Sequence, residues 1–126
     1  MSGRWSRVNL RELPDSGGDG LESRFGRRPL ETEHLGVSYF RYSPGFHVVT
    51  GHTHRSQEEV YVVVGGSGRL RLDDDMIELG LWDAVRVAPG VLRGLEGGPE
   101  GLEVIAVASD RPPEGDVEHA QDWWPR

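Results

Sequence analysis

The sequence predicts an all-β fold, a sandwich or a small closed barrel, and three observations support this. Between positions 35 and 108, short segments of β-type alternation recur about every ten residues, separated by turn residues. The 126-residue chain contains 18 glycines and 8 prolines, as a fold with many turns requires. No window of about 11 residues in this region has a convincing helical period. Seven or eight short strands can protect their edges by closing into a barrel.

The expected elements follow the turn residues along the chain. Residues 1–34 are expected to form an irregular N-terminal arm, because "PDSGGDGLES" has the composition of a loop and "VNLREL" offers one helical turn at most. The barrel should occupy residues 35–108, and residues 109–126 should form an irregular tail. The segment "GRLRLDDDMIEL" predicts a hairpin with its turn at Asp73–Asp75. Other strands are expected within 35–45, 46–54, 58–66, 83–90 and 91–109, the last divided by a turn at Gly97–Pro99.

The composition limits the classes of function. A chain of 126 residues fits one domain. Its net charge of −7 and pI near 5.2 argue against nucleic-acid binding, which requires a basic surface. The absence of cysteine and lysine excludes thiolate metal sites, thiol nucleophiles, disulfides and a Schiff-base lysine. No apolar run approaches the roughly 18 residues of a membrane span, and the N-terminus is too polar for a signal peptide, so we expect a cytoplasmic protein.

His52, His54 and the glutamates after them form a candidate metal site. The two histidines are two residues apart, so in a strand their imidazoles point to the same face. Glu58 or Glu59 begins the next predicted strand and can add a carboxylate oxygen. Two histidines and one carboxylate suit iron(II), manganese, nickel or zinc and leave coordination positions open. The alternative is a solvated surface, where two such histidines beside glutamates are also common.

This stretch resembles the first conserved motif of the cupin superfamily, which reads glycine, His-x-His, three or four residues, glutamate, six residues, glycine. The matching positions here are Gly45, His52, His54, Glu59 and Gly66. The resemblance covers roughly residues 35 to 108 and implies a small double-stranded β-helix, the jelly-roll barrel of the cupins. It also implies Glu59 rather than Glu58 as the third metal ligand. One departure is that six residues separate Gly45 from His52 where the pattern has five.

The second cupin motif is matched by "LWDAVRVAPGVLRGLE" with further departures. Trp82 stands where the family has a glycine, and Arg93 stands where the family has a fourth metal-binding histidine. An arginine has no acceptor atom and does not deprotonate, so it cannot bind a metal. The site would therefore have three protein ligands, unless His47 supplies another. Three residues hold the positions typical of the family: Asp83, Pro89 and Gly90.

Three arrangements of Arg93 remain open. It can point inward beside a three-ligand metal and bind the carboxylate or phosphate of an anionic substrate. It can point inward, pair with Glu59 and replace the metal. It can also face outward and cover apolar surface with its stem. The candidate catalytic residues are Arg93, Tyr61 and Glu58, although Tyr61 equally suits the core, and Gln57 either bonds a histidine or lies exposed.

The expected function is that of a single-domain cupin with a divalent metal that binds or transforms a small metabolite, an anionic one if Arg93 contacts it. An enzyme of this kind would be a metal-dependent dioxygenase, isomerase or lyase, and fold analogy cannot choose among them. The alternative is a metal-free module that binds or senses a small ligand. The expected partners are a small molecule and a second copy in a homodimer, with no nucleic acid and no membrane. Trp123 and Trp124 should dock on the barrel or on the other subunit, since exposed tryptophans are a liability.

Overall fold

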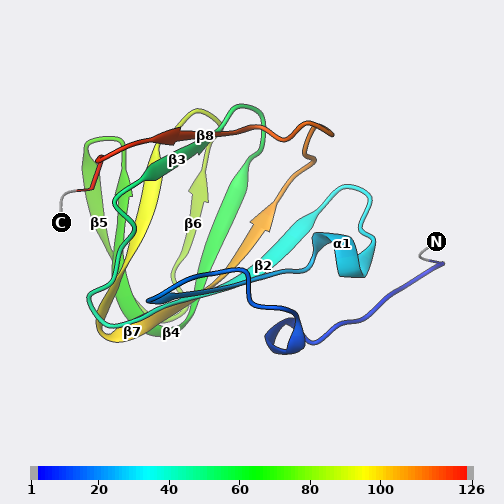
Figure 1. The fold of residues 1–126 in the computed structure, drawn as a ribbon, viewed down its shortest axis with the longest axis horizontal. Coiled ribbons are helices and arrows are strands. Elements are labelled where there is room, and N and C mark those ends of the chain that lie inside the picture. Colours follow the sequence, from blue (N-terminus) through cyan, green and yellow to red (C-terminus); the bar gives the residue numbers. More distant parts are fainter. Residues whose placement is uncertain (1–2, 125–126) are drawn as a thin grey trace.

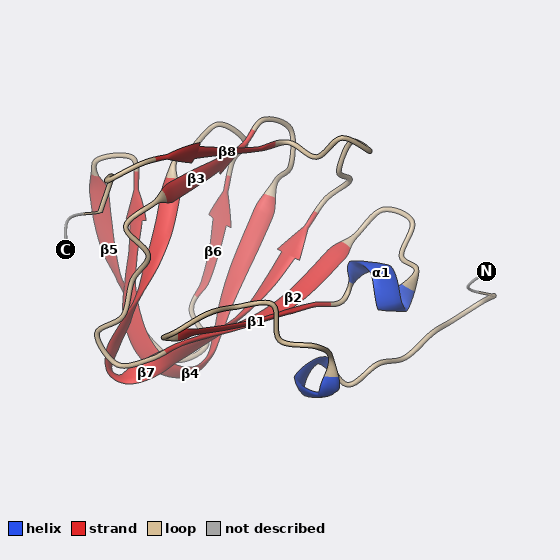
Figure 2. Cartoon of the chain, viewed as in Figure 1, coloured by secondary structure: helices blue, strands red, loops and turns tan. Residues whose placement is uncertain are grey.

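A curled antiparallel sheet of eight strands forms the body of the computed structural model, which describes residues 3–124 (Figures 1 and 2). Two short helical segments, a 3-10 turn at Leu10–Glu12 and α1 at Arg27–Leu30, precede β2. The strands are β1 (Leu21–Phe25), β2 (Gly36–Tyr42), β3 (Gly51–His54), β4 (Glu59–Leu72), β5 (Asp75–Leu79), β6 (Ala84–Val87), β7 (Arg93–Ala108) and β8 (Val117–Ala120).

Two long strands, β4 and β7, organise the sheet. They pair antiparallel from Glu59 opposite Ala108 to Leu72 opposite Arg93. The register shifts between Val63 and Gly68, where β-bulges bend the pair so that the sheet curls. Gly66 has φ +67°, and a Cβ atom there would lie 2.1 Å from the carbonyl oxygen of Gly101. Only glycine therefore fits this corner without strain.

The remaining strands extend this pair on both sides. β2 pairs with β7, and β1 pairs with β2. β5 and β6 both pair with β4. β3 meets β7 where His52 lies opposite Arg93, and β3 pairs with β8 along its whole length. In Figure 2, β3 and β8 lie across the top of the view and β1 and β2 across its lower part, as the curling of the sheet requires. The prediction of an all-β, double-stranded β-helix barrel is confirmed.

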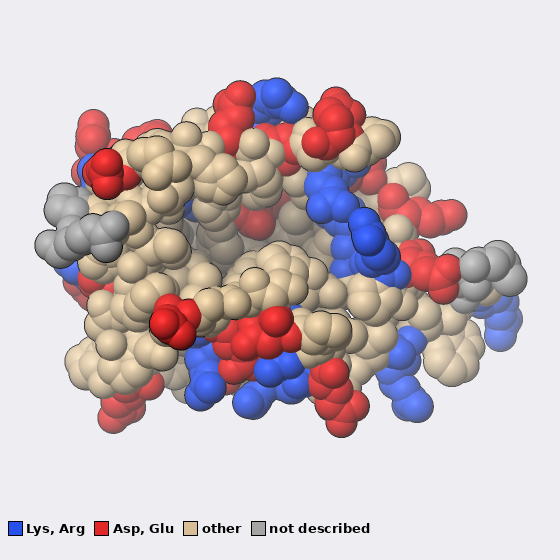
Figure 3. Space-filling model, in the orientation of Figure 1, with Lys and Arg blue, Asp and Glu red and all other residues tan. Residues whose placement is uncertain are grey.

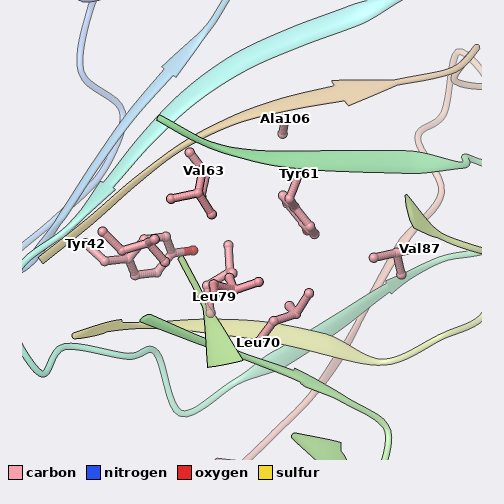
Figure 4. Packing of buried hydrophobic residues seen from close by; sticks show 10 residues of the cluster. Tyr42, Tyr61, Val63, Leu70, Leu79, Val87 and Ala106 are labelled. Atoms are coloured by element: carbon pink, nitrogen blue, oxygen red, sulfur yellow. The ribbon is translucent and has the colours of Figure 1, made fainter. Parts of the chain in front are cut away.

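The core lies inside the curled sheet, against its concave face. Figure 4 shows side chains from β4, such as Tyr61, Val63 and Leu70, pointing toward those of neighbouring strands. Alternate residues of β4 and β7 are buried, as expected for strands with one face toward a core. Tyr61 is 3% exposed, which confirms it as a core residue. The buried apolar cluster comprises Tyr42, Tyr61, Val63, Leu70, Leu79, Val87, Leu95, Leu102, Val104 and Ala106.

Each terminal segment contains a strand that the sequence did not reveal. β1 adds an edge to β2, and β8 adds an edge to β3. Both are short, and β8 reads "VEHA", three of whose four residues are exposed. Neither segment has the apolar alternation from which a strand is predicted. Each pairs through its backbone with the edge of an existing sheet, and such pairing does not require apolar side chains.

Two details inside the barrel differ from the expectation. A strand was expected within 46–54, and β3 occupies only the last four residues of this segment, Gly51–His54. Gly97–Pro99 was expected to be a turn, whereas β7 runs through it. A Cβ atom on Gly97 would lie 2.3 Å from the carbonyl oxygen of Ser43. This glycine therefore permits a close approach of two backbone segments. From the sequence alone, a glycine with this role cannot be distinguished from a glycine in a turn.

The C-terminal tail docks on the barrel, as the two tryptophans predicted. Trp124 is 5% exposed and its ring stacks on His47 at a centroid distance of 4.8 Å. The Arg71 guanidinium lies 4.2 Å from the ring centroid of Trp123, a cation–π contact. The tail thus covers one side of β3. Within residues 3–124, no helix is long and apolar enough to cross a membrane.

Trp82 offers a stability test of the motif position where cupins have glycine. It lies in the turn before β6 with φ +69°, and its side chain is 70% exposed. A left-handed backbone costs an L-residue about 1–2 kcal/mol. We expect Trp82→Gly to raise the free energy of unfolding by roughly 1 kcal/mol, measured by chemical denaturation. Leu81→Gly, at an exposed neighbour without positive φ, should instead lower it. A Trp82→Gly protein less stable than the parent would contradict this.

Candidate metal centre

The three predicted metal ligands converge at one end of the barrel. His52 and His54 lie on β3 and Glu59 begins β4. One donor atom from each lies within 4.8 Å of the other two. The two imidazole rings meet edge to face, with centroids 5.3 Å apart, as two residues on the same side of a strand can do. The prediction that the cupin register selects Glu59 rather than Glu58 agrees with this grouping.

Asp116, which sequence reasoning missed, holds His54 in place. Its side chain is fully buried just before β8, and its Oδ1 accepts a hydrogen bond of 2.9 Å from His54 Nδ1. Its Oδ2 accepts from the backbone amides of Ser56 and Gln57 and from the Ser56 hydroxyl. Burial alone would raise the pKa of Asp116, but these hydrogen bonds, that from His54 foremost, hold the pKa well below its usual range.

The bond to Asp116 also fixes the tautomer of His54. An ionised carboxylate only accepts hydrogen bonds, so the proton of a neutral His54 is on Nδ1 and the lone pair is on Nε2. His54 Nε2 faces Glu59, 3.9 Å from its Oε2. Carboxylates bonded to a metal-binding histidine in this manner orient the ring and raise its basicity as a ligand. No pattern in "RPPEGDVEH" identifies Asp116, because its partner lies 62 residues away.

His52 is also held in the neutral form that metal binding requires. Burial lowers the pKa of His52 to about 3, and the positive charge of Arg93 and the neighbouring histidines His54 and His119 lower it further. A neutral imidazole keeps a lone pair for a metal at any physiological pH.

Arg93 points inward, which excludes the outward arrangement. Its side chain is 0% exposed, and its Nη1 donates to the carbonyl oxygen of Val91 at 3.0 Å. Its Nη2 lies 3.7 Å from Glu59 Oε1, an ion pair without a hydrogen bond. Arg93 Nε, Arg93 Nη2 and Glu59 Oε1 are buried and have no hydrogen-bond partner in the described chain. Such unpaired buried groups are costly unless a further polar group pairs with them.

The donor set fits a divalent cation after a small closure. Metal–ligand bonds of about 2.0–2.2 Å place neighbouring donors about 3 to 3.5 Å apart. The separations of 3.9 Å and up to 4.8 Å here would shorten by about 1 Å as the side chains close around the ion. Glu59 Oε2, which faces His54, and the lone pair on His54 Nε2 are suitable donors. Against this, the charge of Arg93 repels a cation.

The other candidates lie at different places. Glu58 is exposed on the outer face and pairs with Arg86. Tyr61 lies in the core near Glu59, and burial raises the pKa of Tyr61 well above its usual value, so its hydroxyl stays protonated. The expectation that Gln57 is exposed is wrong: its side chain is buried and donates to the Ser109 carbonyl oxygen at 3.1 Å. His47 bonds Glu96 at 2.9 Å and is not part of the grouped ligands.

A cleft of about 580 Å³ leads to His54 and Glu59 from the outside. It lies between the N-terminal arm, α1, β2 and the start of β8, so the terminal segments form much of its wall. Figure 3 shows the molecule hollowed near the centre of this view, with basic side chains along the right of the hollow. The lining residues with charged or amide side chains are Arg27, Arg28, His54, Gln57, Glu59 and Arg111.

Comparison with known proteins supports the cupin assignment at the level of the fold. No family model and no curated protein matches the sequence. An oxalate decarboxylase from Bacillus subtilis superimposes with a TM-score of 0.79 at 22% identity, over 92% of this chain and 32% of that longer chain. Streptomyces PAC13, solved with uridine, gives 0.75 at 16% identity, over 93% of this chain and 91% of that one. A cupin protein from Bacteroides fragilis gives 0.73 at 19% identity, over 87% of both chains.

Proposed function

Given that the chain has the cupin double-stranded β-helix fold, we propose that it is a metalloprotein whose His52, His54 and Glu59 hold one divalent cation. The observation that carries this proposal is the buried Asp116, which orients the lone pair of His54 toward Glu59. A buried imidazole N–H needs an acceptor in any role, but here the acceptor leaves Nε2 free to face the carboxylate of Glu59. Iron, manganese, nickel and zinc all suit two imidazoles and a carboxylate.

The metal would act on a small metabolite that enters through the cleft. A bound cation supplies Lewis acidity, or one-electron chemistry if it is iron, to a ligand at its open positions. The protein contributes the orientation of His54 through Asp116 and the negative charge of Glu59. Because His54 and Glu59 line the cleft, the open positions would face its interior. Arg93 would offset the charge of Glu59 and, on side-chain rearrangement, bind an anionic group of the ligand.

The metal-free alternative also has a specific observation in its favour. Arg93 is close enough to Glu59 to neutralise it, at 3.7 Å, and lies where other cupins have a fourth histidine. In that case the barrel would be a binding or sensing module, with the unpaired atoms of Arg93 and Glu59 available to a polar ligand. The similar oxalate decarboxylase and the PAC13 complex with uridine are compatible with a small polar ligand in either case.

Metal content separates these two functions. Protein produced with all four metals and purified without chelators should carry about one equivalent per chain, measured by inductively coupled plasma mass spectrometry. His52→Ala should reduce the content to background, because only two ligands remain. His34→Ala is the matched control, since His34 is exposed and bonds only Asp110 among the described residues. If the parent protein carries no metal and takes up none of the four after purification, the metal-centre proposal is wrong and the metal-free binding module is the remaining function.

A further inference from the structure

The cleft carries an unusual concentration of positive charge for an acidic protein. Arg27 and Arg28 on α1 and Arg111 after β7 line it, and Glu59 at the inner end is the acidic residue in its lining. None of these three arginines, here called the arginine rim, forms an ion pair within residues 3–124. By contrast, arginines elsewhere on the barrel, such as Arg41, Arg69 and Arg86, pair with glutamates.

Arg27 is held in position rather than extended into solvent. Its Nη2 donates to the carbonyl oxygen of Ser109 at 2.8 Å. A Cβ atom on Gly36 would lie 2.5 Å from the same Nη2, so the missing side chain at position 36 makes room for the guanidinium. Gly36 has no positive φ and does not serve a turn. The packing of Arg27 against it is therefore a direct reason for glycine at this strand position.

The rim arginines repel one another. Partial burial lowers the pKa of Arg27, and the nearby positive charge of Arg111 lowers it further, while Asp110 and Asp116 act in the opposite direction. Two guanidinium groups that line one concave space and repel each other stabilise an anion that binds between them. A purely solubilising surface has no need to gather like charges inside a cleft.

From this geometry we propose that the arginine rim binds the anionic group, a carboxylate or a phosphate, of the ligand whose other end reaches His54 and Glu59. This rests on the proposed function for the inner end of the cleft, but the rim itself needs no metal. A cleft of about 580 Å³ accommodates a metabolite-sized molecule. The walls between the two ends include the apolar residues Phe25, Pro29, Ala106, Ala108 and Val117. The ligand is therefore an elongated organic anion with its charge at the cleft mouth.

The test measures anion binding with succinate and inorganic phosphate as probes and uncharged succinamide as the negative control. Isothermal titration at low ionic strength should detect binding of at least one of the two anions and none of succinamide. Arg27→Gln and Arg111→Gln should each weaken that binding about tenfold or more, because each removes a charge-assisted hydrogen bond. Arg4→Gln, an exposed arginine outside the cleft, makes the same change in net charge and should have little effect.

Gly36→Ala tests the position of Arg27 without removing any charge. The added methyl group should displace the flexible end of Arg27 from Ser109 and weaken anion binding severalfold, with the melting temperature almost unchanged. Equal affinities of the parent, Arg27→Gln, Arg111→Gln and Arg4→Gln proteins would overturn the proposal. So would the absence of binding of both anions to the parent.

The same titrations on chelator-treated and metal-loaded protein separate the rim from the metal centre. Rim-dependent binding to metal-free protein supports the rim even if the metal proposal fails. An unchanged metal content in Arg27→Gln, together with weaker anion binding, supports both. If succinate binds more tightly than phosphate the rim recognises carboxylates, and the reverse order indicates a phosphorylated ligand.

Discussion

Asp116→Asn is expected to reduce metal affinity 10- to 100-fold, the usual effect of losing a carboxylate that orients a metal-binding histidine. An asparagine cannot accept from His54 Nδ1 on one side and from the Ser56 and Gln57 amides on the other, as Asp116 does. If its amide group faces His54, it donates to Nδ1 and moves the imidazole proton to Nε2, the atom that should bind the metal. Competition titration with a chelating dye measures the change.

The same substitution should also lower stability, in a manner that depends on pH. Losing charge-assisted hydrogen bonds to buried groups should lower the free energy of unfolding by roughly 2 to 4 kcal/mol at neutral pH. Because the pKa of Asp116 is held below its ordinary value, its stabilisation is complete above about pH 4 and is lost as the pH falls further. The difference in stability between the parent and Asp116→Asn should therefore shrink in acid, as measured by urea denaturation at several pH values.

Glu118→Gln is the matched control for Asp116→Asn. Glu118 lies on the same strand region, is exposed, and its contact with Arg55 is a long 3.9 Å. Its substitution should change neither metal affinity nor the acid dependence of stability by more than a surface substitution normally does. If Asp116→Asn behaved like Glu118→Gln, the assigned role of Asp116 would be wrong.

Arg93→His is expected to give the second large effect, a roughly tenfold or greater gain in metal affinity. The substitution removes a positive charge next to the cation and places an imidazole opposite His52 across the β3–β7 pair. Arg93 has a fully buried side chain directed at Glu59, so the new histidine should face the site. Arg86→His, on the outer face of β6, is the control. An unchanged affinity in Arg93→His would show that position 93 does not reach the metal.

Arg93→Met separates the two roles that remain open for Arg93. It leaves Glu59 buried without a counter-ion, and loss of one partner of a buried pair typically costs about 3 to 5 kcal/mol. If Arg93 replaces the metal, the variant should be strongly destabilised and recover when a divalent metal is added. If Arg93 accompanies a metal that is already bound, the loaded variant should be far less affected, since the cation balances Glu59. Thermal denaturation with and without metal distinguishes these results.

The sequence was sufficient to predict the barrel and the grouping of His52, His54 and Glu59, and the reasons are local. His52 and His54 share a face because strands alternate, and Glu59 follows within five residues. It was insufficient for Asp116 and the arginine rim, because their partners are distant in sequence. His54 and Asp116 are 62 residues apart, and Arg27 and Ser109 are 82 residues apart. The orientation of Arg93 was also undecided, since a strand residue next to an irregular turn can face either way until the pairing of β3 with β7 is known.

The pairing of β3 with β8 affects the order in which synthesis, folding and metal binding can occur. Both histidines and Glu59 leave the ribosome well before Asp116, and β8, which directly follows Asp116, can join β3 only after β7 has been made. Before that step the hydrogen bond from His54 to Asp116 cannot form, so neither the tautomer nor the orientation of the imidazole is fixed for a cation. Metal binding would accordingly follow the completion of folding. A chain with a damaged C-terminal tail would then fail to retain metal.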